Sequence, residues 1–195
     1  MNTITIHTYS FSELKKEVQK KVIKEQWDIN ISHDLWYDPV FEDSKEIGKI
    51  LGLEIKELGF SLDNSWGDNG AWFDGKYSYS KDSVEKIKEY APLDIELHGF
   101  ASKLAEIQEK YSGEIRAYIT VRRHVEIEVE YLSGDEEVPD EVETAVKAIL
   151  QEFMDWIYEQ LHKLQESLLT TEDIIYTLES NDYQFTENGN RIIYL

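Results

Sequence analysis

Two runs of alternating apolar and polar residues, separated by only three positions, limit the folds open to this chain more than any other feature. Residues 115–121 and 125–131 alternate with a period of two, as strands with one buried face do. Matching their apolar faces pairs residue 121 with 125, 119 with 127 and 117 with 129, because a one-residue shift would turn every buried side chain outward. The sequence therefore predicts an antiparallel hairpin with Arg116 opposite Glu130, Thr120 opposite Glu126, and residues 122–124 as its loop.

Amphipathic helices are predicted on both sides of this hairpin in the sequence. The longest covers residues 140–167, where an apolar residue recurs every three or four positions. Others are predicted at residues 10–27, where Ser10 and Glu13 have the spacing of a capping box, at 38–52, at 82–112 with a break near Pro92, and at 171–180. Strands are predicted at residues 4–9, and at 53–62 and 71–79 around a turn at 64–70; a small hairpin around Asn188 and Gly189 follows at the end.

These elements predict an α+β fold, in which antiparallel strands and hairpins are flanked by amphipathic helices and a long helix lies near the C-terminus. The 195 residues suit a single domain, for which residues 1–113 and 114–195 are candidate sub-lobes. A content of 41% apolar and 12% aromatic residues is typical of a folded protein, because disordered acidic segments contain few aromatic side chains.

The acidic residues are concentrated toward the C-terminus. Residues 1–125 contain 22 Asp/Glu and 17 Lys/Arg, a net charge of −5, whereas residues 126–195 contain 18 and 3, a net charge of −15. Such a segment repels nucleic acid and anionic membranes and attracts basic surfaces. We therefore expect a basic protein as the partner, with no direct binding of nucleic acid or membrane; the sequence leaves homo-oligomerisation open.

Two sets of carboxylates in this segment are regularly spaced and are the predicted partner-binding residues. Glu126, Glu128 and Glu130 share one face of a strand, at intervals of roughly 6.5–7 Å. The second set falls within a sector of about 60° on the long helix, at 100° per residue; it comprises Glu141, Glu152, Asp155, Glu159 and Glu166. The alternative interpretation is that these carboxylates form an ordinary solvated surface, since amphipathic helices place charge outside.

The usual catalytic and metal-binding patterns are missing from the sequence. There is no cysteine, the five histidines are scattered without the spacing of a zinc site, and the glycine-containing turn at residues 66–70 lacks the lysine of a P-loop. We expect a binding protein rather than an enzyme, with no cofactor and no metal. The N-terminus lacks a secretory pattern and no apolar run could span a bilayer, so a cytoplasmic location is expected.

Several segments resemble a family of small proteins from phages and prophages. They are YSFSEL at residues 9–14, WYDPVFED at 36–43, IGKILG at 47–52, FS at 60–61 with WGDNGAWF at 66–73, and LESNDYQFTENG at 178–189. Members are mostly uncharacterised, and some carry a loose label of toxin–antitoxin antitoxin. The resemblance implies a phage-encoded protein that acts inside a bacterial cell, and it implies no catalytic residues.

Together, the resemblance and the acidic surface predict an inhibitor of a bacterial defence system. It would bind the basic nucleic-acid-binding surface of a host nuclease or effector by mimicking DNA, as an anti-CRISPR or anti-restriction protein. Two alternatives remain open. One is an antitoxin that neutralises a basic toxin; the other is a protein that sequesters a nucleotide signal through residues 66–79, aided by Arg116, Arg122 and Arg123.

Overall fold

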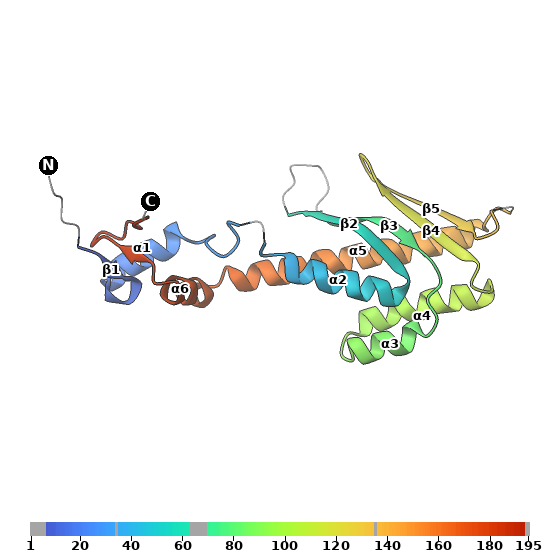
Figure 1. Ribbon diagram of the computed structural model, residues 1–195, viewed down its shortest axis with the longest axis horizontal. Coiled ribbons are helices and arrows are strands. Elements are labelled where there is room, and N and C mark those ends of the chain that lie inside the picture. The colour runs from blue at the N-terminus through green and yellow to red at the C-terminus, as the bar shows by residue number, and fades with distance from the viewer. Residues whose placement is uncertain (1–6, 34, 63–69, 135, 194–195) are drawn as a thin grey trace. The chain divides into compact units, whose positions relative to one another are not determined.

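The computed structural model describes residues 7–33, 35–62, 70–134 and 136–193, and it contains two compact units (Figure 1). The central unit comprises residues 38–162, and the terminal unit comprises residues 1–37 together with 163–195. These limits differ from the candidate boundary near residue 113, because strands on either side of that position pair with each other. The predicted α+β class is confirmed.

The central unit contains one four-stranded antiparallel sheet and four helices. In chain order its elements are α2 (Asp38–Leu51), β2 (Leu53–Ser61), β3 (Gly70–Tyr77), α3 (Ser83–Tyr90), α4 (Ile95–Lys110), β4 (Ile115–Val121), β5 (Val125–Tyr131) and α5 (Asp140–Leu168), the last of which continues into the terminal unit. The strand order is β2-β3-β4-β5. The hairpin of β4 and β5 has the predicted register, with Val121 opposite Val125 and Arg116 opposite Glu130.

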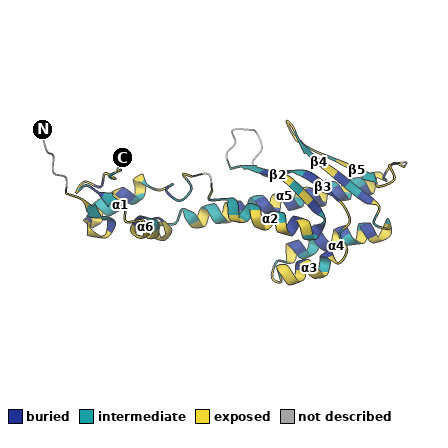
Figure 2. Ribbon diagram, viewed as in Figure 1, coloured by how far each residue is buried: buried dark blue, intermediate teal, exposed yellow. Residues whose placement is uncertain are grey.

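The sheet buries one face against the helices and leaves the other exposed. Along β3 and β4, buried residues alternate with residues that are mostly half-buried, as the colours of Figure 2 show. On the buried face, the rings of Phe73 and Phe100 both make edge contacts with Phe153 of α5, at centroid distances of 6.1 and 6.2 Å. The residues in the buried stripe of α5 are Val142, Val146, Ile149, Leu150, Phe153, Met154, Trp156, Ile157 and Leu161. The long helix predicted from periodicity is therefore a central element of the core.

Two polar side chains connect helices to the rest of the core. Asp94 is the N-cap of α4: its Oδ1 accepts from the Leu97 amide at 3.0 Å, while its Oδ2 accepts from Trp156 Nε1 at 3.1 Å. Gln108, 1% exposed, donates from Nε2 to the Tyr77 hydroxyl at 3.0 Å and to the Ile115 carbonyl at 2.7 Å, and its Oε1 accepts from the Ile115 amide at 3.3 Å. Because the pairing of β3 with β4 ends at Tyr77 and Ala117, Gln108 supplies the partner that Ile115 lacks on that side.

The terminal unit is formed by both ends of the chain. Its elements are β1 (Tyr9–Ser10), a 3₁₀ turn at Phe11–Glu13, α1 (Lys16–Glu25), the end of α5, α6 (Thr171–Ser180) and β6 (Gln184–Phe185), and β1 pairs antiparallel with β6. Its buried cluster consists of Phe11, Leu14, Val22, Ile29, Ile174, Leu178 and Phe185. The predicted strand at residues 4–9 and the turn at 64–70 lie mostly outside the described residues.

The prediction of one helix over residues 10–27 was wrong at its start. The Ser10 amide does donate to Glu13 Oε2, at 2.8 Å, but this contact closes only a 3₁₀ turn, and Leu14 and Lys15 are extended before α1 begins. The break lets both Phe11 and Leu14 enter the buried cluster. The same hydrogen bond lowers the pKa of the Glu13 carboxyl.

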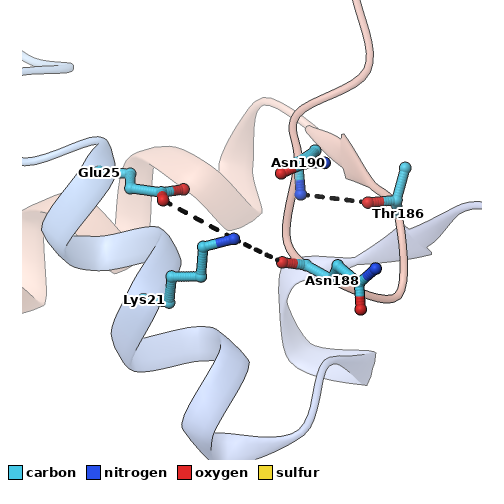
Figure 3. Close-up of polar contacts among 5 residues, drawn as sticks. All are labelled: Lys21, Glu25, Thr186, Asn188 and Asn190. Atoms are coloured by element: carbon cyan, nitrogen blue, oxygen red, sulfur yellow. Dashed lines mark hydrogen bonds and ion pairs between the residues drawn. The ribbon is translucent and has the colours of Figure 1, made fainter.

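The C-terminal turn is held against α1, as Figure 3 shows. Lys21 Nζ donates to the Asn188 carbonyl at 3.0 Å and lies 3.7 Å from Glu25 Oε1, while the Asn190 amide donates to Thr186 Oγ1 at 3.2 Å. Gly189 has a φ of +85° and packs so closely that an added Cβ would lie 2.9 Å from two valine side chains of α1. The predicted turn at Asn188 and Gly189 is therefore confirmed.

Candidate functional site

The predicted carboxylates of β5 lie on the exposed face of the sheet. Register places Glu126 opposite Thr120, Glu128 opposite Tyr118 and Glu130 opposite Arg116. Glu130 Oε1 accepts from Arg116 Nε at 2.7 Å, so its charge is compensated within the hairpin. Glu126 and Glu128 are exposed, and among the described residues neither forms an ion pair. Of the three carboxylates of β5, these two therefore carry the uncompensated charge.

The predicted carboxylates of α5 are partly neutralised by α4. Lys103 Nζ lies 2.7 Å from Glu152 Oε2, and Lys110 Nζ lies 3.7 Å from Glu141 Oε1. These two basic residues are contributed by a neighbouring helix and were not foreseen, because the angular position of a residue on one helix says nothing about the charges on the next. The helical set is therefore less negative than its sequence indicates.

The other members of the helical set have different surroundings. Asp155 is exposed and its Oδ1 accepts from Gln151 Nε2 at 3.0 Å. Glu159 is exposed on the same helix. Glu166 is exposed too, but it belongs to the terminal unit, so it is described separately from the others. Within the central unit, Asp155 and Glu159 thus extend the acidic side of α5.

A shallow depression lies where β5 meets α5. It has a volume of about 610 Å³ and is lined by residues 125–128 of β5 and by Lys147, Ala148 and Gln151 of α5. Glu126 and Glu128 from the strand set therefore lie at the same depression as Gln151, whose amide is bonded to Asp155 from the helical set. Two carboxylates of the strand set therefore line the depression, whereas no member of the helical set does; the contribution of α5 is Lys147, Ala148 and Gln151. Lys147, which lines it, is paired with Glu143 at 2.6 Å.

Basic side chains on the exposed face of the sheet are already engaged by carboxylates. Lys76 Nζ lies 2.7 Å from Glu54 Oε2; this contact lowers the pKa of the Glu54 carboxyl and raises the pKa of the Lys76 ammonium group. Arg116 is held by Glu130. The nucleotide-binding alternative relied on Arg116, Arg122 and Arg123 to offset the acidic charge, and Arg116 is the one of these that a carboxylate already engages. The loop in that alternative falls partly on residues 63–69, outside the described residues.

The described ranges contain neither a metal-binding cluster nor a membrane-spanning helix. No three His, Asp or Glu side chains of the described residues are grouped so that they could hold a metal ion. Among the same residues, no helix has the length and apolar character needed to cross a bilayer. The depression between β5 and α5 is therefore the candidate functional surface.

The central unit matches a known protein family. A family model described as a domain of unknown function, DUF8835, matches residues 36–171, more than half of the chain. The chain belongs to the DUF8835 family. No curated protein and no solved structure matches it. The DUF8835 match nearly coincides with the central unit and includes both β5 and α5, so the candidate surface lies inside the family domain.

Proposed function

We propose that this DUF8835 protein is a phage-encoded inhibitor of a bacterial defence system that acts in the cytoplasm of the host. It binds the basic nucleic-acid-binding surface of a nuclease or related effector, as an anti-CRISPR or anti-restriction protein would, and occupies that surface as a mimic of DNA. The phage origin rests on the resemblance of the sequence segments given above. The binding mode rests on the electrostatics of the central unit.

One observation carries the proposal: two carboxylates of β5, Glu126 and Glu128, form no ion pair among the described residues and line a single depression. Glu126 and Glu128 are about 6.5–7 Å apart along the strand, roughly twice the 3.4 Å axial spacing of phosphates in one DNA strand. Asp155 is one helical turn along α5 from Gln151, which lines the depression and donates a hydrogen bond to it at 3.0 Å. A basic groove that binds DNA would also attract this surface electrostatically, and the affinity would fall as salt is raised.

The antitoxin alternative uses the same electrostatics but a different partner. A toxin neutraliser would have one small dedicated partner, whereas an inhibitor of a defence effector competes with nucleic acid for a channel. Elution by DNA distinguishes the two, because only the defence effector, and not the toxin, has a nucleic-acid site under the acidic surface.

The surface can be tested with matched charge reversals. We would immobilise the wild-type protein and the variant Glu126→Lys/Glu128→Lys/Asp155→Lys, and capture proteins from a bacterial lysate. Glu152 is left unchanged because Lys103 already neutralises it. The triple variant should lose the captured partner, since three attractive contacts become repulsive.

The control is a variant with the same change in net charge at another place. Glu85, Glu89 and Glu106 are exposed on α3 and α4, and reversing them to Lys should leave capture intact. Thermal unfolding of both variants confirms that they are folded. Equal loss of capture in the two variants would mean that only total charge matters. If the Glu126→Lys/Glu128→Lys/Asp155→Lys variant still captured the partner, the depression would not be the binding surface.

A further inference from the structure

The free edge of β5 is an unpaired row of backbone hydrogen-bonding groups. In the order β2-β3-β4-β5, β5 pairs with β4 on one side, and no other described strand pairs with it on the opposite side. Its register with β4 runs over seven residues without a shift. A flat edge of this kind is a template for an added strand.

The positions of the free groups follow from the hairpin. The Arg122 amide donates to the His124 carbonyl at 3.2 Å, and the Leu132 amide donates to the Glu114 carbonyl at 2.8 Å. In an antiparallel pair, hydrogen-bonded and non-hydrogen-bonded positions alternate, so even-numbered residues bond across the hairpin. The amides and carbonyls of Val125, Ile127 and Val129 therefore point away from β4.

The other edge of the same sheet is protected. β2 has a register shift between Ile55 and Glu57, which leaves Lys56 as an extra residue on that edge. Bulges and edge lysines are the usual devices that prevent strand addition. β5 has neither a bulge nor a proline, and its apolar side chains, Val125, Ile127 and Val129, are only half-buried. The contrast singles out β5 as the edge left open.

The charges on the outer face of β5 determine which kind of added strand is favoured. Side chains of an added strand on the outer face would stand beside Glu126 and Glu128, and opposite charges at such cross-strand positions stabilise a sheet whereas like charges destabilise it. A second copy of β5, paired antiparallel with matching faces, would set glutamate beside glutamate. The edge therefore disfavours self-association and favours a strand with Lys or Arg at every second position.

We infer that the edge of β5 binds an extended basic segment of a partner protein as a fifth strand of the sheet. Alternate Lys or Arg side chains of that segment pair with Glu126 and Glu128, and the residues between them enter the depression lined by Ala148 and Gln151. Such strand addition takes its affinity from main-chain hydrogen bonds and its specificity from alternate side chains. The inference deepens the proposed function and rests on it only for the basic character of the partner.

Two peptides of identical composition test the inference without a host protein. One is a labelled heptapeptide that alternates four lysines with three valines; the other has the four lysines in a block followed by the three valines. Fluorescence anisotropy at low salt should give the alternating peptide at least about tenfold higher affinity, because only it can place lysines on one face of a strand. Amide hydrogen exchange should show new protection at Val125, Ile127 and Val129.

Variants at one residue separate backbone pairing from charge. Ile127→Pro removes an outward amide without breaking the hairpin, as proline is tolerated on the free side of an edge strand. It should abolish the preference for the alternating peptide, whereas Ile127→Ala, which keeps the amide, should retain it. If Ile127→Pro lowers the melting temperature strongly, an alternating peptide N-methylated at its valines replaces it, and this peptide should bind the wild-type protein no better than the block peptide.

Equal affinity of the alternating and block peptides, or undiminished binding of the N-methylated peptide, would overturn the inference. The peptide assay contains no nuclease, so its failure leaves the elution of a captured host protein by DNA unaffected. Conversely, a captured partner that DNA cannot elute would count against DNA mimicry while leaving the peptide result valid.

Discussion

Replacing Gln108 with leucine should destabilise the central unit strongly, although the two side chains are similar in volume. Gln108 is 1% exposed and makes three hydrogen bonds, to the Tyr77 hydroxyl and to both backbone groups of Ile115. The variant leaves these three groups buried without partners. Each orphaned group costs about 1–3 kcal/mol, and burying the apolar leucine offsets part of that loss with roughly 1.5–3 kcal/mol. We expect a net loss of about 2–4 kcal/mol in the free energy of unfolding.

Urea denaturation followed by tryptophan fluorescence measures this loss, since Trp156 is buried in the same core. Tyr77→Phe is the matched control: it removes one hydroxyl but leaves both bonds to Ile115, so it should cost only about 1 kcal/mol. Because Tyr77 and Gln108 are bonded to each other, the double variant should cost less than the sum of the single variants. A loss below about 1 kcal/mol for Gln108→Leu would refute the view that the amide completes the edge of the β3–β4 pairing.

Three further predictions follow from the contacts. Gly189→Ala should destabilise the terminal unit by about 1–3 kcal/mol in urea denaturation, and more than Gly134→Ala, because both have positive φ but an added Cβ at Gly134 meets nothing within 4 Å. Burial raises the pKa of Tyr77 from 10.0 to about 12, so the stability due to its neutral hydroxyl is complete below pH 10 and is lost as pH rises toward 12; Tyr77→Phe should lose less stability over this range in the same measurement. The Lys103→Ala/Lys110→Ala variant should bind the basic alternating peptide severalfold more tightly in anisotropy at low salt, because two carboxylates of α5 lose their basic partners. Unchanged affinity would mean that these carboxylates lie too far from the bound peptide to attract it.

The parts of the fold that could be predicted from the sequence are those with a local cause. The register of β4 and β5 followed from matching two apolar faces across a three-residue loop, and α5 followed from its apolar stripe. The position of α6 and the break between α3 and α4 near Pro92 also have local signals. In each of these elements the pattern that indicates the element also determines which face is buried.

Other features depend on contacts between distant segments. Pairing of β3 with β4 joins residues far apart in the sequence, and neither strand carries a pattern that identifies its neighbour. Gln108 is polar in a largely apolar helix face, and its burial makes sense only once Ile115 is known to lack a strand partner. The start of α1 was mispredicted because the capping contact of Ser10 and Glu13 closes a 3₁₀ turn, after which Leu14 is extended and enters the buried cluster.

The candidate site, like the fold, could be predicted from the sequence only where the cause is local. Spacing along β5 and angular position along α5 identified the carboxylates correctly as surface groups, but only Glu126 and Glu128 line the depression. The sequence could not show that Lys103 and Lys110 compensate two of them, since these basic residues come from α4. The pairing of Arg116 with Glu130, by contrast, agrees with the predicted register. Nor could it show that the sheet ends at β5, which is the fact that leaves a backbone edge beside the acidic side chains.

The most direct test of the central claim is elution of a captured host protein by DNA. The protein is immobilised, exposed to bacterial lysate at moderate salt, washed, and treated with duplex DNA at constant ionic strength. Mimicry of DNA predicts that the duplex releases a nucleic-acid-processing protein, and that the Glu126→Lys/Glu128→Lys/Asp155→Lys variant captures none of it. A partner that stays bound in the presence of excess duplex would contradict the account and place the contact outside any nucleic-acid site.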